Sequence, residues 1–217
     1  MEAAGVPRVA RVNGEAAATD NRRERASAPG FAKGSVAVNL VIFGPPGAGK
    51  GTQSRLLCEK FHLTHLSTGD AIRAAIRSGS ELGKLAKERV SRGELISDEL
   101  VTELVDDFVA SYRKQSDSFL FDGYPRTVQQ VAQLDEIIEK HRLTQPAVVN
   151  LEVSDEDLML RITGRRICME CKRTFNVHLD AISAHAECEL CHGTSQLFQR
   201  DDDKPETLIE RLRVYHE

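Results

Sequence analysis

The sequence predicts a three-layer α/β fold built on a parallel central sheet. Three near-continuous apolar runs, VAVNLVIFG from Val36, SFLFDGYP from Ser118 and AVVNLEV from Ala147, are typical of strands buried on both faces. Segments with helical spacing separate these runs, and strand–helix–strand alternation implies parallel pairing through right-handed crossovers. With 217 residues, 41% of them hydrophobic, the chain is long enough for one sizeable core with small inserted lobes.

The segment before the first apolar run has a different composition. Residues 1–35 are rich in Ala, Arg, Gly and Ser without helical or strand periodicity, and we predict a disordered tail there, followed by one folded domain over 36–217. A mitochondrial transit peptide is the alternative. Five arginines favour it, whereas four acidic residues oppose it, because such peptides are poor in acids: Arg8, Arg11, Arg22, Arg23 and Arg25 against Glu2, Glu15, Asp20 and Glu24.

Helices are predicted between and after the apolar runs. The spacing of Leu56, Leu57 and Phe61 predicts a helix directly after the first run, with Cys58 as a small core residue on its apolar face. Further helices are expected over about 70–90, from Ser97 as N-cap to Tyr112, over 127–141 and from 204 onward. The chain stops at Glu217 inside this last helix; the family resemblance given below implies a further edge strand after this point, so we expect one edge of the sheet to lie bare.

The charge balance excludes some classes of partner. A formal net charge of −4 provides no general attraction to nucleic acid or to an anionic membrane surface. No apolar run approaches the roughly 18 residues that a membrane span requires, and no signal-peptide pattern is present. We therefore expect a cytoplasmic protein without membrane or nucleic-acid partners, and a monomer.

A glycine-rich loop, GPPGAGKGTQ, joins the first apolar run to the first helix. It departs from the usual phosphate-binding pattern, because Gly51 stands where a hydroxyl residue is normal and Thr52 follows one place later. Backbone N–H groups at the start of a helix nevertheless bind anions, and Lys50 adds a charge that can reach the β- and γ-phosphates. Its place between strand and helix favours phosphate binding over a simple tight turn.

Four cysteines lie within 24 residues in the spacing C-x2-C-x16-C-x2-C, in a segment with few large apolar residues. This spacing predicts a tetrahedral zinc site that holds a small lobe together, and four protein ligands make the zinc structural. Histidines nearby, His178, His185 and His192, are alternative ligands. A nucleic-acid-binding zinc lobe is disfavoured because the segment carries balanced charge and no interleaved aromatic residues. The predicted ligands are Cys168, Cys171, Cys188 and Cys191.

The altered loop and four further motifs give the chain a family resemblance. LSTGDAIR (66–73), FDGYPRT (121–127), LRITGRR (160–166) and RDDDKPETLIERL (200–212) follow the loop, and together they resemble the adenylate kinases and related nucleoside monophosphate kinases. The resemblance covers 37–217. It implies the P-loop NTPase fold with a core (36–66, 97–164 and 204–217), a helical AMP-binding lobe (67–96) and a zinc-bearing β lid (165–203).

The resemblance also implies roles for individual residues. The catalytic set is Lys50, Arg126, Arg165, Arg200, Arg211 and Asp122, in which Asp122 orders magnesium-bound water; its alternative role is a cap for the helix that follows. ATP binding falls to Gly44, Pro46, Gly47, Ala48, Gly49, Lys50, Gly51, Thr52, Arg161 and Arg165, with Arg161 stacked on the adenine. AMP binding falls to Thr68, Gly69, Arg73, Glu94, Leu95, Ile96, Gly123, Tyr124, Arg126, Gln130, Arg200 and Arg211, with Gln130 reading the adenine edge. Asp202 and Asp203 are lid acids that order the arginines, while Asp201 is expected to be a solvated charge.

The arginines agree with this chemistry on physical grounds. Phosphoryl transfer needs aligned substrates and neutralised charge in a site without competing water, and guanidinium groups give permanent, bidentate contacts to phosphate. The expected reaction transfers the γ-phosphoryl group of Mg-ATP to AMP and gives two ADP, with Mg²⁺ as the ion of ATP and Zn²⁺ as a structural ion. The alternatives are a GTP-dependent AMP kinase and a kinase for another monophosphate such as UMP or CMP. The long lid and Gln130 favour AMP as acceptor.

Overall fold

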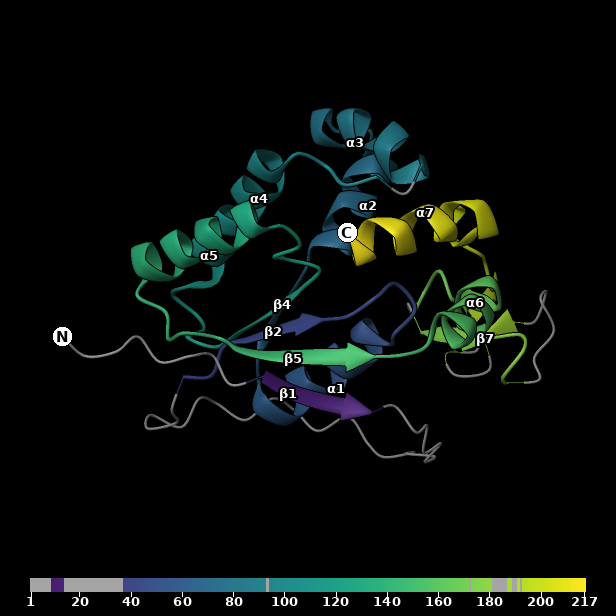
Figure 1. Ribbon diagram of the computed structural model, residues 1–217, viewed down its shortest axis with the longest axis horizontal. Helices are drawn as coiled ribbons and strands as arrows, with labels where there is room; N and C mark the ends of the chain where they lie inside the picture. Colours follow the sequence, from purple (N-terminus) through teal and green to yellow (C-terminus); the bar gives the residue numbers. More distant parts are fainter. Residues whose placement is uncertain are drawn as a thin grey trace.

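A parallel sheet forms the centre of the molecule (Figure 1). The computed structural model describes residues 9–13, 37–92, 94–171, 173–180, 187, 188, 191 and 193–217. Within them, five strands pair in the order β1-β5-β2-β4-β3, every neighbouring pair parallel, which confirms the predicted fold class. The strands are β1 (Val9–Asn13), β2 (Leu40–Phe43), β3 (Thr64–Ser67), β4 (Phe119–Asp122) and β5 (Ala147–Glu152).

Both faces of this sheet are covered, which explains why the strands read as continuous apolar runs. Val41 of β2 packs in one core cluster with residues of α4 (Asp98–Tyr112) and α5 (Val128–His141). Its neighbours Leu40 and Ile42 point the other way, into a second cluster that partly buried Leu57 and Cys58 of α1 (Lys50–Phe61) join. Burial raises the pKa of the Cys58 thiol to about 11, in keeping with its predicted place in the core.

The predicted helical region over 70–90 is two helices, α2 (Thr68–Ser78) and α3 (Glu81–Arg92). The break falls at Gly79, whose φ of 66° is left-handed. The two helices then pack closely at Gly83, where a Cβ atom would lie 2.1 Å from the carbonyl oxygen of Ala75. A second glycine is therefore needed for this contact, and α2 and α3 form one small body above the sheet (Figure 1).

The helix starts differ in how they are capped. The Thr127 hydroxyl accepts a hydrogen bond from the Gln130 N–H at 3.1 Å and caps α5, so Asp122 is not the cap of that helix. Ser97 precedes α4 as predicted, but its side chain makes no capping hydrogen bond. Acidic Asp98 and Glu99 occupy the first turn of α4, where they complement the positive end of the helix.

The expectation of a disordered tail is wrong for Val9–Asn13. These residues form β1, which pairs parallel with β5 from Val9↔Val148 to Asn13↔Glu152. The sheet edge that we expected to be bare is thus covered, and the pairing supplies backbone partners for the outer edge of β5. A five-residue strand with no period-2 pattern is set by this tertiary pairing, so local composition does not reveal it. The rest of the predicted tail lies outside the described residues, as does any test of a transit peptide.

The lid and the C-terminal helix lie at one end of the sheet (Figure 1). In the described part of the lid, strands pair antiparallel in two small sheets, and the buried core consists of Cys168, Cys188 and Leu197. No helix among the described residues is long and apolar enough to cross a membrane. The remaining elements are α6 (Asp155–Thr163), β6 (Arg165–Ile167), β7 (Thr174–Asn176), β8 (Glu187–Cys188), β9 (Gly193–Gln196), the 3₁₀ turn η1 (Asp201–Asp203) and α7 (Pro205–His216).

Candidate active site

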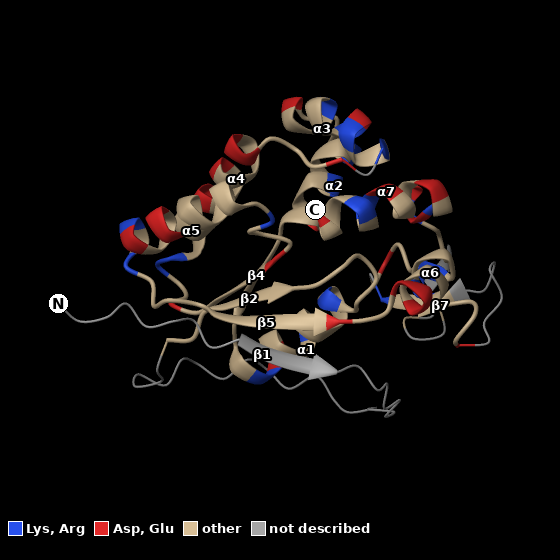
Figure 2. Ribbon diagram, in the orientation of Figure 1, with Lys and Arg blue, Asp and Glu red and all other residues tan. Residues whose placement is uncertain are grey.

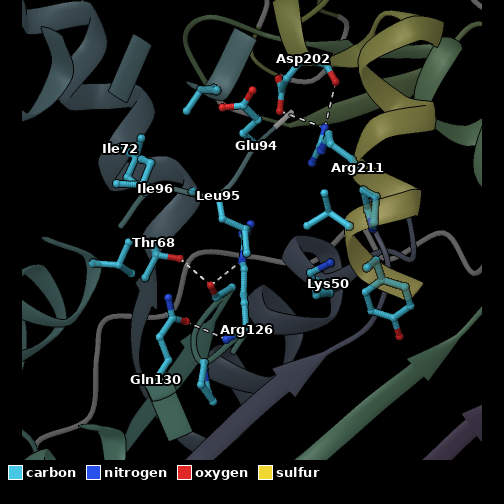
Figure 3. A pocket seen from close by; sticks show the side chains of 18 of the residues that line it. Lys50, Thr68, Ile72, Glu94, Leu95, Ile96, Arg126, Gln130, Asp202 and Arg211 are labelled. Carbon is cyan, nitrogen blue, oxygen red and sulfur yellow. Dashed lines mark hydrogen bonds and ion pairs between the residues drawn. The ribbon is translucent and has the colours of Figure 1, made fainter. Parts of the chain in front are cut away.

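A pocket opens where β2 and β4 end, at the edge at which open α/β sheets place their ligands. Its walls come from the glycine loop, from α2, from the segment 94–96, from the β4–α5 loop and from α7. In Figure 3, Lys50, Arg126 and Arg211 extend from three of these elements toward the same space. Elsewhere both signs of charge are spread over the surfaces of α3, α5 and α7 (Figure 2), so the gathered cations are a local feature.

The glycine loop has the conformation that its sequence demands. Gly44, Gly47 and Gly49 have φ values of 141°, 84° and 96°, which L residues rarely adopt. A Cβ atom on Gly47 would also lie 2.7 Å from the Ile162 side chain, so both the positive φ and the lack of space require glycine there. α1 begins at Lys50, and its N-cap residue Gly49 has no side chain that could cap the first backbone N–H groups. The helix start, with its positive dipole end, therefore remains available to the pocket.

Lys50 is folded back onto the loop. Its Nζ donates hydrogen bonds to the carbonyl oxygens of Gly44 and Pro45 at 2.7 and 2.8 Å. Burial lowers the pKa of Lys50 to about 7, and although the Asp122 carboxylate raises it, nearby arginines lower it further. An anion in the pocket would add the missing negative charge and favour the ammonium form.

Arg126 crosses the floor of the pocket (Figure 3). Its Nε donates to the carbonyl oxygen of Gly123 at 2.8 Å, and the Thr68 hydroxyl donates to the same oxygen at 3.0 Å. A Cβ on Gly123 would approach both side chains to 2.9 Å or less, which explains a glycine at this position. The Arg126 side chain is exposed toward the pocket, with protein atoms around it. Desolvation by these atoms and the charge of Arg211 lower the pKa of Arg126 to about 10.

The two predicted lid acids hold two of the predicted arginines. Asp203 is fully buried and accepts two hydrogen bonds from Arg165, one of them from Nε at 2.8 Å. Burial lowers the pKa of Arg165, but these bonds outweigh it, so the pKa lies above the usual value. Arg211 donates to the Asp202 carboxylate at 3.0 Å and to its carbonyl oxygen at 2.9 Å. Asp201 is exposed, as predicted.

Asp70, which sequence reasoning missed, connects α2 to the lid border. Its carboxylate accepts from Arg73 at 2.7 Å and lies 3.7 Å from a nitrogen of Arg200. Burial and the neighbouring Arg73 and Arg165 lower the pKa of Arg200 to about 10. Arg73 also lies 3.9 Å from Asp202, so arginines from distant parts of the chain share carboxylates. Asp70 follows the helix start in the sequence and reads there as an ordinary first-turn acid.

The structure brings most of the predicted site residues to this pocket and leaves some outside its walls. Tyr124 is buried in the core, where its hydroxyl shares a 3.0 Å hydrogen bond with Thr102; its aromatic ring favours packing over nucleotide contact. Arg161, Arg165 and Arg200 lie outside the walls; Arg200 is linked to the wall residue Arg73 through the Asp70 carboxylate, whereas Arg165 pairs with Asp203, which also lies outside them. The other predicted residues outside the walls are Gly47, Ala48, Gly49, Gly51, Thr52 and Asp122. The predicted residues among the walls are Gly44, Pro46, Lys50, Thr68, Gly69, Arg73, Glu94, Leu95, Ile96, Gly123, Arg126, Gln130, Asp202 and Arg211.

Further walls are apolar or aromatic, and the sequence motifs gave no sign of them. Ile72, Val90 and Val101 line the side of the pocket near α2 and α3. Phe43 and Tyr215 line another part and stack with ring centroids 5.7 Å apart. Their helical or strand spacing predicted burial, but not which space they would face.

Asp122, at the end of β4, is nearly buried and lies 3.6 Å from the Nε2 atom of His65. A carboxylate oxygen beside the glycine loop is the hard donor that Mg²⁺ prefers, so this residue fits a role beside magnesium-bound water.

The four predicted cysteine ligands lie together in the lid. Their sulfur atoms are all within 4.8 Å of one another, with 3.6 Å between Cys168 and Cys191 and between Cys171 and Cys188. Hydrogen bonds from the backbone of Cys171 lower the pKa of the Cys168 thiol to about 7, which favours a thiolate. The set is a closed group of four soft donors and fits a structural zinc ion. His178 is exposed and does not belong to the cluster, whereas His185 and His192 lie outside the described residues.

A parallel sheet, a glycine loop that opens a helix and cations gathered around one pocket define a phosphate-transferring enzyme of the P-loop class. Comparison with known proteins narrows this class, because the family model described as adenylate kinase matches residues 42–217. An adenylate kinase of Desulforamulus reducens is 44% identical over 180 residues, which cover 83% of each chain. One of Alkaliphilus oremlandii is 44% identical over 82% of this chain and 81% of its own, and one of Methanothrix thermoacetophila is 39% identical over the same shares.

The chain belongs to the adenylate kinase family and is a phosphotransferase.

Proposed function

We propose that the chain catalyses the reversible transfer of the γ-phosphoryl group of ATP to AMP, giving two ADP, and so balances the adenine nucleotides. The observation that carries this proposal is the meeting of Lys50, Arg126 and Arg211, from three separate elements, at one pocket beside the glycine loop. Phosphoryl transfer asks little covalent chemistry of a protein, and fixed cations around the moving group supply most of what it needs.

The acceptor side of the pocket fits a nucleoside monophosphate. Ile72, Val90 and Val101 offer apolar surface for a base, while Arg73 and Arg126 offer guanidinium groups for its phosphate. Apolar and guanidinium groups that line the same pocket fit a ligand with an apolar and an anionic end. These features support AMP in this part of the pocket.

The donor phosphates belong on the glycine loop. Its backbone N–H groups and the start of α1 would cradle them, and Lys50 would leave the Gly44 and Pro45 carbonyl oxygens to contact them. Arg165, Arg200 and Arg211 would close over the transferred group from the lid side, and Arg161 would lie against the adenine. Asp122 would hold the water of the Mg²⁺ that accompanies ATP, an ion that would neutralise phosphate charge.

Two mobile lobes would exclude water during the transfer. The first is the AMP-binding lobe, residues 67–96, and the second is the lid, residues 165–203. The remaining residues, 36–66, 97–164 and 204–217, form the core. Closure keeps ATP from hydrolysis and brings the lid arginines to the phosphates. Zn²⁺ bound by Cys168, Cys171, Cys188 and Cys191 would hold the lid in shape without taking part in the reaction.

A matrix of substrates tests this proposal. Initial rates would be measured with ATP, GTP and ITP as donors and AMP, GMP, CMP and UMP as acceptors, with Mg²⁺ present. We expect the highest kcat/KM for ATP with AMP. A higher value for a pyrimidine acceptor, or for GTP as donor, would replace this assignment by one of the other nucleotide kinases. A Lys50→Met variant from the same purification controls for contaminating kinases.

The setting of the reaction is part of the proposal. We place the protein in the cytoplasm as a monomer, acting on free nucleotides without nucleic-acid or membrane partners. Native mass spectrometry would give its assembly and its metal content together.

A further inference from the structure

Asp98, in the first turn of α4, stands behind the pocket wall and contacts two residues at the start of α5. Its Oδ1 atom accepts a hydrogen bond from the Gln130 amide Nε2 at 2.7 Å, and its Oδ2 atom accepts one from the Thr127 hydroxyl at 2.7 Å. Gln130 itself lines the pocket and is 2% exposed. Asp98 thus touches a group that faces the ligand space without lining that space itself.

The partners of Gln130 leave its amide one orientation. An ionised carboxylate only accepts hydrogen bonds, so the Asp98 side must face the amide nitrogen. On the other side the backbone N–H of Arg126, which only donates, bonds the amide oxygen Oε1 at 2.7 Å (Figure 3). Rotating the amide by half a turn would set nitrogen against N–H and oxygen against carboxylate, and both hydrogen bonds would be lost.

These two bonds use half of the amide's capacity. A glutamine side chain has two N–H donors and two oxygen lone pairs. Among the described residues, Asp98 takes one donor and the Arg126 N–H takes one lone pair. One donor and one acceptor of known arrangement are left for a base that enters the pocket.

We propose that Asp98 is a positioning residue that makes the acceptor site select 6-amino purines over 6-oxo purines, an inference that rests on the proposed function. Adenine presents an acceptor at N1 and a donor at its 6-amino group. Hypoxanthine presents the reverse, a donor at N1 and an acceptor at O6. An amide locked in one orientation complements the first edge and opposes the second, whereas an amide free to rotate serves both.

The test compares AMP with IMP, which differ at these two positions of the base. The kcat/KM for each would be measured with ATP, and the Kd of each by calorimetry, so that discrimination is measurable even where IMP turns over too slowly to detect. In Asp98→Ala we expect the AMP-to-IMP ratio to fall about tenfold, the effect of losing one of the two anchoring hydrogen bonds. In Asp98→Asn, which keeps an oxygen that can accept from Nε2, most of the ratio should return.

Glu99→Ala is the matched control, because Glu99 is the other acid in the first turn of α4 and contacts Gln129 instead of Gln130. It should leave the ratio unchanged. Asp98→Ser, with a polar residue that suits the start of a helix, replaces the alanine variant if that variant does not fold.

Three results would overturn the inference. The first is equal loss for AMP and IMP in Asp98→Ala, which marks Asp98 as structural. The second is the same shift of the ratio in Glu99→Ala, and the third is no recovery in Asp98→Asn. A wild-type protein that phosphorylates no purine monophosphate would instead refute the proposed function, a result that is separate from all three.

Discussion

Arg165 and Arg126 show two ways in which this protein places a cation at the site: the Arg165 side chain is partly buried, whereas Arg126 is exposed toward the pocket. Arg165, at the border of the lid, bonds the fully buried Asp203 carboxylate through two N–H groups, and its pKa lies above the usual value. Arg126, on the pocket floor, makes its side-chain hydrogen bond among the described residues to a backbone carbonyl, and its pKa falls to about 10. The charge of Arg165 is balanced inside the fold. Arg126 has no hydrogen-bonded carboxylate among the described residues, so its charge is available to an anion in the pocket.

The difference assigns separate duties to the two residues. An arginine paired with an internal carboxylate is positioned before any ligand arrives, and its removal leaves a buried charge behind. An arginine without such a partner, and exposed toward a pocket, keeps its charge available for an anion that binds there. The predictions below test this contrast, beginning with the largest expected effect.

Arg126→Ala should remove the cation that the fold leaves unbalanced. We expect turnover to fall by about 10²–10³-fold, the usual effect of losing one group that stabilises transition-state charge. The melting temperature should change little, because the side chain is exposed to the pocket and its Nε bonds a single backbone carbonyl oxygen. Steady-state kinetics and circular dichroism melting measure the two quantities. Near-normal turnover would refute the role of Arg126 in catalysis. A large drop in melting temperature would show that its charge is paired within the fold.

Asp203→Ala should act in the opposite sense, mainly on stability. It leaves the Arg165 guanidinium without its buried carboxylate, and breaking a buried pair on one side costs about 3–5 kcal/mol. Urea unfolding would measure the free energy. In a double-mutant cycle, Arg165→Leu combined with Asp203→Ala should be more stable than Asp203→Ala alone. Strict additivity of the two substitutions would contradict the pairing.

Removal of metal should loosen the lid before the core. The described lid core contains Cys168, Cys188 and Leu197, too little apolar surface to hold the lobe by itself, and a structural zinc ion contributes folding free energy directly. With a chelator, or in Cys171→Ser, we expect a separate early melting transition and faster hydrogen exchange confined to 165–203. A melting curve that is unchanged by the chelator and by Cys171→Ser would exclude a structural metal ion in the lid.

The smallest effect is expected at the sheet edge beside β5. In an edge strand, alternate backbone N–H groups face the partner, so proline should cost about 1–2 kcal/mol at one of two neighbouring positions and little at the other. Arg11→Pro and Val12→Pro provide this pair, and Ala4→Pro is the control outside the strand. Hydrogen exchange at Val148 and Val149 would report the loss of pairing. Identical behaviour of all three variants would contradict the presence of β1.

Much of the fold and of the pocket followed from local sequence. Buried parallel strands need continuous apolar runs, and a loop with positive φ angles needs glycine, so both are written in neighbouring residues. The spacing of the four cysteines likewise predicted that they form one cluster. The motif arginines were assigned through the family resemblance, which the demand of phosphate for fixed positive charge supports, and the structure added the carboxylates that contact them.

The features that escaped prediction depend on contacts between distant segments. β1 exists through pairing with β5, more than 130 residues away, and has no local pattern. Asp98 looked like an ordinary acid at a helix start, because its bonds to Thr127 and Gln130 appear only once α4 and α5 lie side by side. Tyr124 stands within a nucleotide-kinase motif, yet its ring is buried in the core and its hydroxyl bonds Thr102.

The lowered pKa of the folded-back Lys50 amine links nucleotide binding to pH. With a pKa of about 7, a large share of the free protein carries an uncharged amine at pH 8, and a bound phosphate restores the proton by raising that pKa. Phosphate binding at this pH would therefore withdraw hydrogen ions from solution, and the heat of binding should vary with the ionisation enthalpy of the buffer. Nucleotide binding would thus respond, through one amine, to the pH of the surroundings.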